Sequence, residues 1–143
     1  MAALSPLRVI AVLGLGLAAP HLWIESMFPW SWYVFTPLLK GLSASFGVKG
    51  PWIVYLSGFI HSIVVGSLFA LALRGVAGFA WLTASAIFCV AFLVSLVGSF
   101  DPSISMLEAL SLPFWFLAEV AFLFVCVVGA YGVLRRFPRS HGA

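Results

Sequence analysis

The stretch from Pro51 to Arg74, PWIVYLSGFIHSIVVGSLFALALR, decides the fold. It carries no charged side chain before Arg74, and a helix of this length extends roughly 36 Å at a rise of about 1.5 Å per residue. That length is enough to cross the hydrocarbon core of a bilayer, which is about 30 Å thick. The stretch therefore predicts a membrane-spanning helix. His61 lies near its middle, where an ionisable side chain is costly and needs an explanation.

The composition of the whole chain points to the same environment. Of its 143 residues, 64% are hydrophobic and 8% are charged, and the mean hydropathy is +1.19. A soluble domain carries roughly 25% charged residues, and a soluble chain of this length could not bury so much apolar surface. Four segments of roughly 20 residues would use most of the chain. We therefore predict a single membrane domain, with no room for a separate soluble one.

The apolar segments predict an all-α, polytopic membrane protein with four transmembrane helices in one bundle. The predicted spans cover about residues 7–28, 51–74, 76–100 and 110–134. Residues 29–50 join the first two spans as an outward-facing interfacial helix or loop, in which Trp30, Trp32 and Tyr33 are anchors at the headgroup level. Residues 135–143 form a short polar tail. The two halves share no motif, which gives no support for an inverted-repeat transporter.

The first span has two interpretations. Arg8 precedes an apolar run from Val9 to Ala19, and small residues end that run, as they do in a cleaved signal peptide. The other interpretation is a retained helix that continues through Pro20 to about Phe28, because the apolar pattern goes on past the proline and membrane helices tolerate one. We favour the retained helix, and cleavage of residues 1–19 is the alternative.

The basic residues set the predicted orientation, because Lys and Arg near span ends stay on the cytoplasmic side. Five of the seven basic residues fall on one side of a four-span topology, namely Arg8, Arg74, Arg135, Arg136 and Arg139. Lys40 and Lys49 fall on the other side. Both termini are then cytoplasmic, and the short loops fit a bacterial inner (plasma) membrane. This bias explains the net charge of +3, and no nucleic-acid partner is predicted.

Four ionisable side chains lie within the predicted spans, and all of them fall in the outer half. Counting residues from the span ends puts His61 and Glu119 deepest, at roughly 9 to 15 Å from the outer face. His21 and Glu25 lie nearer to that face and are four residues apart, so that they share one side of a helix. Ser57 lies one turn before His61. The inner half has no ionisable residue away from its ends.

These residues are the candidates for a polar pocket open to the outer side, which would bind a proton, an ion or a small ligand. The structural alternative is that one buried His61–Glu119 pair only fixes the register of two helices. A metal or haem site using His21 and His61 is a further alternative, because imidazole and carboxylate groups suit iron, zinc or copper. Contact with a partner subunit is another. For His21 and Glu25, the alternative is solvation at the membrane interface.

Small residues recur every fourth position on the second span, at Gly58, Ser62 and Gly66. Such a row lets another helix approach closely. The connection from the second to the third span is very short, which predicts a two-helix hairpin. Cys89 and Cys126 each lie inside an apolar run and are predicted to pack as small hydrophobic residues. A disulfide or a metal pair is the alternative.

No catalytic motif is present: the chain has no glycine-rich phosphate loop, no G-x-S-x-G turn and no H-E-x-x-H zinc motif. Enzyme activity is therefore not predicted. Our leading prediction is a small integral membrane protein that acts in a membrane assembly, as a homo-oligomer or an accessory subunit. Its partners are then the lipid bilayer and other membrane subunits or itself. The first alternative is a transporter or channel that uses Glu119 and His61. The second is a haem- or metal-binding subunit of an oxidoreductase; otherwise no cofactor is predicted.

Overall fold

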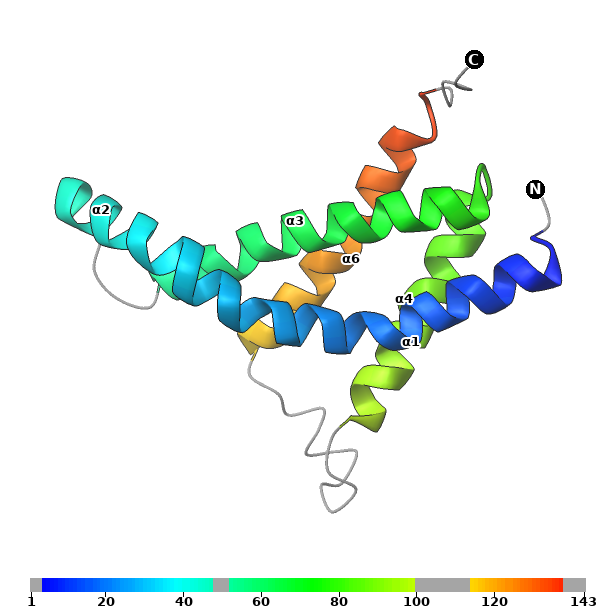
Figure 1. Ribbon diagram of the computed structural model, residues 1–143, viewed down its shortest axis with the longest axis horizontal. Coiled ribbons are helices and arrows are strands. Elements are labelled where there is room, and N and C mark those ends of the chain that lie inside the picture. Colours follow the sequence, from blue (N-terminus) through cyan, green and yellow to red (C-terminus); the bar gives the residue numbers. More distant parts are fainter. Residues whose placement is uncertain (1–3, 48–51, 100–113, 138–143) are drawn as a thin grey trace.

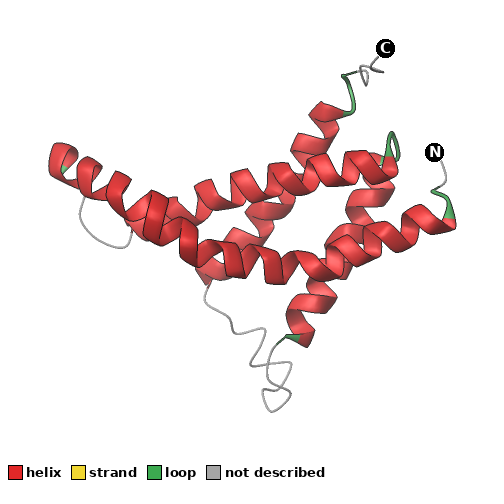
Figure 2. Ribbon diagram, viewed as in Figure 1, coloured by secondary structure: helices red, strands yellow, loops and turns green. Residues whose placement is uncertain are grey.

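The computed structural model describes residues 4–47, 52–99 and 114–137. Its elements in chain order are α1 (Pro6–Pro29), the π-helix η1 (Trp30–Phe35), α2 (Thr36–Phe46), α3 (Trp52–Ala77), α4 (Trp81–Gly98) and α6 (Phe114–Leu134) (Figure 1, Figure 2). Four of them, α1, α3, α4 and α6, are long and apolar enough to cross a membrane. The prediction of an all-α bundle with four spans is confirmed, and no strand occurs in the described parts of the chain.

The predicted boundaries can be compared only in part. The end of the segment 29–50, the junction before the fourth span and the end of the polar tail 135–143 lie outside the described residues. The third span begins at Trp81 rather than at residue 76, because α3 continues to Ala77. Gly78 then takes a φ of 65°, in the left-handed region that favours glycine, and so ends α3.

Helix α1 runs unbroken through Pro20, and retention of residues 1–19 stays a prediction. A proline inside a helix removes one backbone hydrogen bond and commonly bends or breaks the helix. Here Pro20 is buried together with Val12, Gly16, Ala19 and Trp23, on the side of α1 that packs into the bundle. Membrane helices tolerate a proline where neighbouring helices surround the freed backbone group.

The helical backbone does not stop at the end of α1. Trp30 and Phe35 keep right-handed helical angles, so that α1, η1 and α2 follow one another without a turn. The predicted interfacial segment is therefore helical in its described part. It ends at Gly47, whose φ of 64° again suits glycine. In Figure 1, α2 reaches past the start of α3 and lies outside the four-helix bundle.

The four spans pack as two main pairs, α1 with α4 and α3 with α6, and α1 also contacts α3. The members of each main pair run in the same direction. We call the end of the bundle at which α1 leads into η1 the Trp30 end, and the opposite end, at the α3–α4 turn, the Gly78 end. The start of α1 and the end of α6 also lie toward the Gly78 end (Figure 1).

The predicted hairpin of the second and third spans is only partly right. The turn between α3 and α4 is short, but α3 packs mainly against α6 and α4 packs mainly against α1, rather than against each other. Glycines explain the preference. A β-carbon at Gly16 would lie 2.7 Å from Ala91 Cβ and 2.8 Å from the carbonyl oxygen of Phe88, and one at Gly66 would lie 2.9 Å from Cys126 Cβ. Both pairs are therefore in backbone-to-backbone contact.

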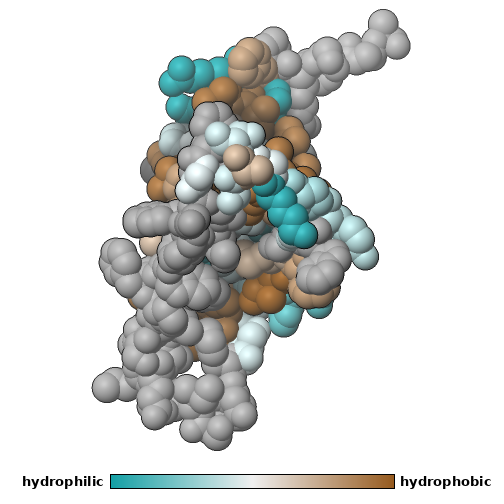
Figure 3. Space-filling model, turned by 90° about the vertical axis from the view of Figure 1, so that its left-hand side faces the viewer, coloured by the Kyte–Doolittle hydropathy of each residue, from teal (hydrophilic) through white to brown (hydrophobic). Residues whose placement is uncertain are grey.

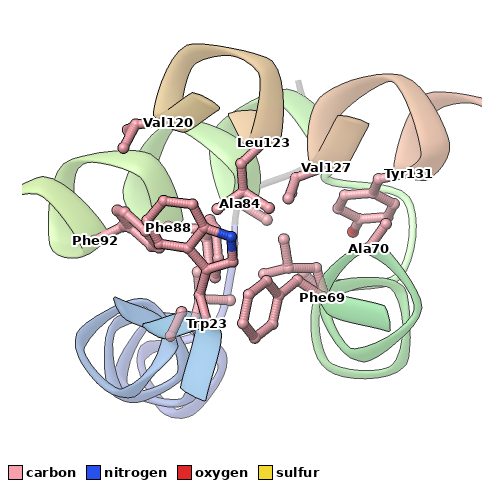
Figure 4. Close-up of a cluster of buried hydrophobic side chains, with 14 of the residues drawn as sticks. Trp23, Phe69, Ala70, Ala84, Phe88, Phe92, Val120, Leu123, Val127 and Tyr131 are labelled. Atoms are coloured by element: carbon pink, nitrogen blue, oxygen red, sulfur yellow. The ribbon is translucent and has the colours of Figure 1, made fainter. Parts of the chain in front are cut away.

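An apolar core fills the space between the four spans. Trp23 and Phe92 pack with ring centroids 6.1 Å apart, and Phe69 and Phe88 with centroids 5.4 Å apart. Toward the Gly78 end the core continues through Leu123, Val127 and Tyr131, all three of them fully buried (Figure 4). Such aromatic and aliphatic packing leaves few voids as large as a water molecule.

Tyr131 on α6 and Arg135, just after α6, contact the turn between α3 and α4 and the start of α4 at the Gly78 end. The hydroxyl of Tyr131 donates a hydrogen bond to the carbonyl oxygen of Gly78 at 3.0 Å. The guanidinium group of Arg135 lies 4.5 Å from the ring centroid of Trp81, which is cation–π distance. Large apolar side chains are exposed on the outside of the bundle, Leu68 and Val94 among them, and Figure 3 shows apolar surface beside polar residues on the α2 side. Exposed apolar side chains of this kind suit contact with lipid.

Candidate functional site

Helix α3 carries the centre of the polar site on two successive turns. Ser57, His61 and Ser62 are all buried there, with His61 1% and Ser62 0% exposed. Gly58 lies between them on the same side of the helix and is buried too. These positions face α1 and α6, because residues three and four apart share one side of a helix. The row Gly58, Ser62 and Gly66 is thus covered by the chain's own helices.

His61 is held by a serine from α1. Its Nε2 lies 2.9 Å from Ser26 Oγ, and the Ser26 hydroxyl in turn donates to the carbonyl oxygen of Trp23 at 3.1 Å. When the single Ser26 hydroxyl hydrogen is used in the bond to Trp23, Nε2 of His61 is the donor in its bond with Ser26. Nδ1 of His61 is then an acceptor. It is buried and has no hydrogen-bond partner among the described residues.

Trp30 closes the site on the side of η1. Its ring lies against the His61 imidazole, with ring centroids 5.9 Å apart and an angle of 55° between the planes. The indole Nε1 of Trp30 is buried, and no described residue accepts a hydrogen bond from it. The unused donor Nε1 of Trp30 and the unused acceptor Nδ1 of His61 therefore belong to two rings in contact. Buried polar groups in this condition are rare in folded proteins.

Glu119 brings a carboxyl group from α6. It is 4% exposed, and it lies so close to α3 that a β-carbon at Gly58 would be 2.7 Å from its carboxyl carbon. Gly58 precedes His61 by one turn, which puts Glu119 slightly nearer to the Trp30 end than His61. Oε2 of Glu119 has no hydrogen-bond partner in the described parts of the chain. No hydrogen bond or ion pair joins Glu119 to His61, although the two side chains approach the same side of α3.

His21 and Glu25 are not part of this buried group. Both are exposed on α1, because they lie about half a turn away from Trp23 and the rest of the buried side of that helix. The structure records no hydrogen bond or ion pair between them. In the aromatic segment, Tyr33 is 75% exposed while Trp30 lies against His61, and anchoring at the headgroup level stays a prediction. The side chain of Trp32 lies outside what the structure describes.

Ser26 was not among the predicted site residues, and Trp30 was predicted to be an anchor at the headgroup level rather than part of the polar site. Ser26 follows Trp23 by three residues within the predicted first span, and Trp30 follows Trp23 by seven residues, provided that the helix continues past Pro29. The two prolines and the dense aromatics suggested instead that the helix ends there. Helical spacing from Trp23 was therefore the signal that could have located Ser26 and Trp30. For Trp30 it was usable only with the knowledge that the helix continues past Pro29.

The donor sets for metal binding do not come together in the described residues. Among residues 4–47, 52–99 and 114–137, no three His, Cys, Asp or Glu side chains form a group that could hold a metal ion. His21 is exposed and His61 is buried. Cys89 and Cys126 are free thiols, and Cys126 packs against Gly66 as a small apolar residue would.

The site thus holds four buried polar atoms without partners among the described residues, Nδ1 of His61 and Oγ of Ser62 on α3, Nε1 of Trp30 on η1 and Oε2 of Glu119 on α6. No protein-family model matches the chain, and neither a curated protein nor a solved structure matches it.

Proposed function

We propose that the protein is a small integral membrane protein that binds a small polar ligand between α1, α3 and α6, at the Trp30 end of its bundle. One observation carries the proposal: His61 Nδ1, Trp30 Nε1 and Glu119 Oε2 are buried at this end without partners among the described residues. Leaving such groups unsatisfied costs about 1–3 kcal/mol each. A ligand that satisfies them recovers that free energy on binding.

The chemistry of the three atoms defines the ligand class. With Nε2 of His61 bonded to Ser26, Nδ1 of His61 is available to accept a hydrogen bond from a ligand, and Nε1 of Trp30 is available to donate one. A hydroxyl or primary amide group can both donate to the first and accept from the second. Glu119 adds an acceptor, or a cation partner when it is ionised. We therefore propose a small hydroxylated or amide-bearing solute, or its ammonium analogue.

The proposed orientation puts the site toward the outside of the cell. Arg8, Arg74 and Arg135 belong to the Gly78 end, which makes that end cytoplasmic by the positive-inside bias. The Trp30 end then faces outward, in a bacterial inner membrane, with both termini inside. The ligand would reach the site from the outer side.

Transport through the bundle is the second candidate, and one observation limits its form. Phe69, Phe88, Leu123 and Val127 fill the path from His61 toward the Gly78 end. An open channel is therefore disfavoured in this conformation, and a carrier would need a second one. Proton or solute flux into proteoliposomes that Glu119→Gln abolishes would favour the carrier over simple binding.

The direct test identifies molecules that co-purify with the protein. The wild type and three variants, Glu119→Gln, Trp30→Phe and Glu25→Gln, are extracted from the native host into lipid nanodiscs. Their small molecules are then compared by mass spectrometry. We expect one polar compound that is present with the wild type and Glu25→Gln and depleted at least tenfold with Glu119→Gln and Trp30→Phe. Equal profiles for all four proteins would refute the binding site.

The assembly role remains our proposal for the wider context of this site. The sequence support for it changes, because the small-residue row on α3 is covered by α6 within the chain. An assembly must therefore use another surface, and α1 offers one.

A further inference from the structure

Helix α1 has an exposed side that the chain itself does not cover. Five residues define it, and we call it the His21 face: Ala11, Gly14, Ala18, His21 and Glu25. All five are exposed, and they are separated alternately by three and four residues, which is the spacing of a helix–helix seam. The His21 face lies roughly opposite Val12, Gly16 and Trp23, through which α1 packs into its own bundle.

Gly14 is the first sign that another helix belongs on this face. Gly16, Gly58 and Gly66 are each explained by close approach within the chain, since a β-carbon there would meet atoms at 2.9 Å or less. A β-carbon at Gly14 would meet nothing within 4 Å, as is also true at Gly129 on α6, so that Gly14 counts here because it shares one side of α1 with Ala11, Ala18, His21 and Glu25. Glycine lowers helix stability, and small residues on membrane helices commonly mark a packing surface.

His21 and Glu25 are the second sign, and they are independent of Gly14. They lie about 12 and 6 Å before the end of α1 at Pro29, on the outside of a helix that is long and apolar enough to cross a membrane. Neither has a hydrogen-bond or ion-pair partner among the described residues. Ionisable side chains at membrane depth normally face protein or water and pair with one another. If this side of α1 faced lipid, His21 and Glu25 would contact neither protein nor water.

We propose that the His21 face is where two copies of this chain meet, α1 against α1, about a two-fold axis along the membrane normal. The Glu25 carboxylate of each copy accepts a hydrogen bond from the His21 imidazole of the other. The charge pattern selects a second copy as the partner, because the face carries both members of the pair and is complementary to itself. A different partner would need its own matching acid and base in the same register.

The geometry of a helix favours this pairing. His21 and Glu25 lie one turn apart on the same side of α1, so that their levels differ by about 6 Å. In a parallel pair of α1 helices, the Glu25 side chain of each copy extends across this difference to the imidazole of the neighbouring copy. The small side chains at Ala11, Gly14 and Ala18 let the two backbones approach over the other half of the seam. The dimer does not depend on the ligand proposed for the His61 site.

Disulfide crosslinking in native membranes tests the contact directly. In a background with Cys89→Ala and Cys126→Ala, Ala18→Cys places one thiol on the seam, and Val94→Cys places one on α4, where the side chain is 61% exposed. On mild oxidation we expect a dimer from Ala18→Cys and only monomer from Val94→Cys. Monomer from both variants, or crosslinking at residue 94 alone, would overturn the proposal.

Matched bulky substitutions supply the second measurement. Gly14→Leu puts a bulky side chain on the His21 face, and Gly129→Leu puts one on α6; at both positions a β-carbon meets nothing within 4 Å. We expect Gly14→Leu to weaken dimerisation in bilayers by on the order of tenfold or more, and Gly129→Leu to leave it unchanged. A cooperative thermal unfolding transition for each variant would show that both fold. Equal dimer affinity for both would contradict the proposed seam.

A charge exchange separates the specific pair from general packing. In His21→Glu, each copy presents two carboxylates, at residues 21 and 25, to the two carboxylates of the other copy. We expect this variant to weaken the dimer on the order of tenfold. Adding Glu25→His to it restores one base and one acid on each copy and should recover most of the wild-type affinity. A double variant that dimerises no better than His21→Glu would show that the two side chains do not pair.

Discussion

The carboxyl group of Glu119 on α6 lies directly against the backbone of Gly58 on α3, where a β-carbon would stand 2.7 Å from the carboxyl carbon. Glycine at this position therefore gives the carboxyl group its place beside α3, one turn from His61. The contact joins the two helices of a main packing pair at the level of the polar site.

Gly58→Ala should move the carboxyl group rather than unfold the protein. The atoms in the way are the far end of a flexible side chain, which can rotate aside. We expect a loss of at most about 1 kcal/mol in the free energy of unfolding, measured in mixed micelles. The compound that co-purifies with the wild type should be depleted as it is with Glu119→Gln. Full retention of the compound would show that the position of Glu119 does not matter for binding.

Gly16→Ala should destabilise the protein much more than Gly14→Ala does. At residue 16 the added carbon meets Ala91 Cβ and the backbone oxygen of Phe88, neither of which can rotate away. Overpacking of this kind costs about 1–3 kcal/mol. At residue 14 the added carbon meets nothing within 4 Å, so that the monomer should be unaffected or slightly more stable. Equal unfolding free energies for the two variants would contradict the close packing of α1 on α4.

Ser26→Ala should weaken the contact between α1 and α3 at the polar site. It removes the partner of His61 Nε2 and leaves that buried N–H unsatisfied, for which we expect a loss of about 1–3 kcal/mol in unfolding free energy. The matched control is Ser67→Ala, because the Ser67 hydroxyl donates only to Ile63 O of its own helix at 2.7 Å. That variant should change stability by less than about 0.5 kcal/mol. A loss for Ser67→Ala as large as for Ser26→Ala would count against the role of Ser26.

Tyr131→Phe tests the hydrogen bond that joins α6 to the turn between α3 and α4 at the Gly78 end. The substitution removes the hydrogen bond to Gly78 O and keeps the buried ring, so that we expect about 0.5–1.5 kcal/mol less stability. Tyr33→Phe is the control, since Tyr33 is 75% exposed, and it should have no measurable effect on unfolding. A neutral Tyr131→Phe would show that α6 is held at this end by packing alone.

Composition and hydropathy were sufficient to predict four spans, because hydrocarbon admits only helices with their backbone groups paired internally. The depth of His61 and Glu119 in the membrane rests on counting residues at a constant helix rise and stays a prediction. The partners of each helix did not follow. Short connections favour neighbours in sequence, but Gly16 and Gly66 provide closer contacts between α1 and α4 and between α3 and α6.

The polar site was predictable as a list of residues but not as a set of contacts. His61 and Glu119 stand out because ionisable side chains are costly in membranes. Their expected pairing depends on rotation of α6 by a fraction of a turn, which no sequence pattern specifies. Trp30 enters the site only because the helix passes Pro29, whereas the nearby prolines and aromatics predicted an end there. Ser26 lies inside the predicted first span, but a serine in a membrane helix carries no signal of its own.

The measurement that tests the account most directly is native mass spectrometry of the gently extracted protein. The wild type should give a dimer, twice the 15.4 kDa of the chain, with a small bound mass on each copy. Glu119→Gln should keep the dimer and lose the small mass, and Gly14→Leu should give a monomer that retains it. A wild-type spectrum with the same bound mass as Glu119→Gln, or with none, would contradict the central claim of a ligand site at His61, Trp30 and Glu119.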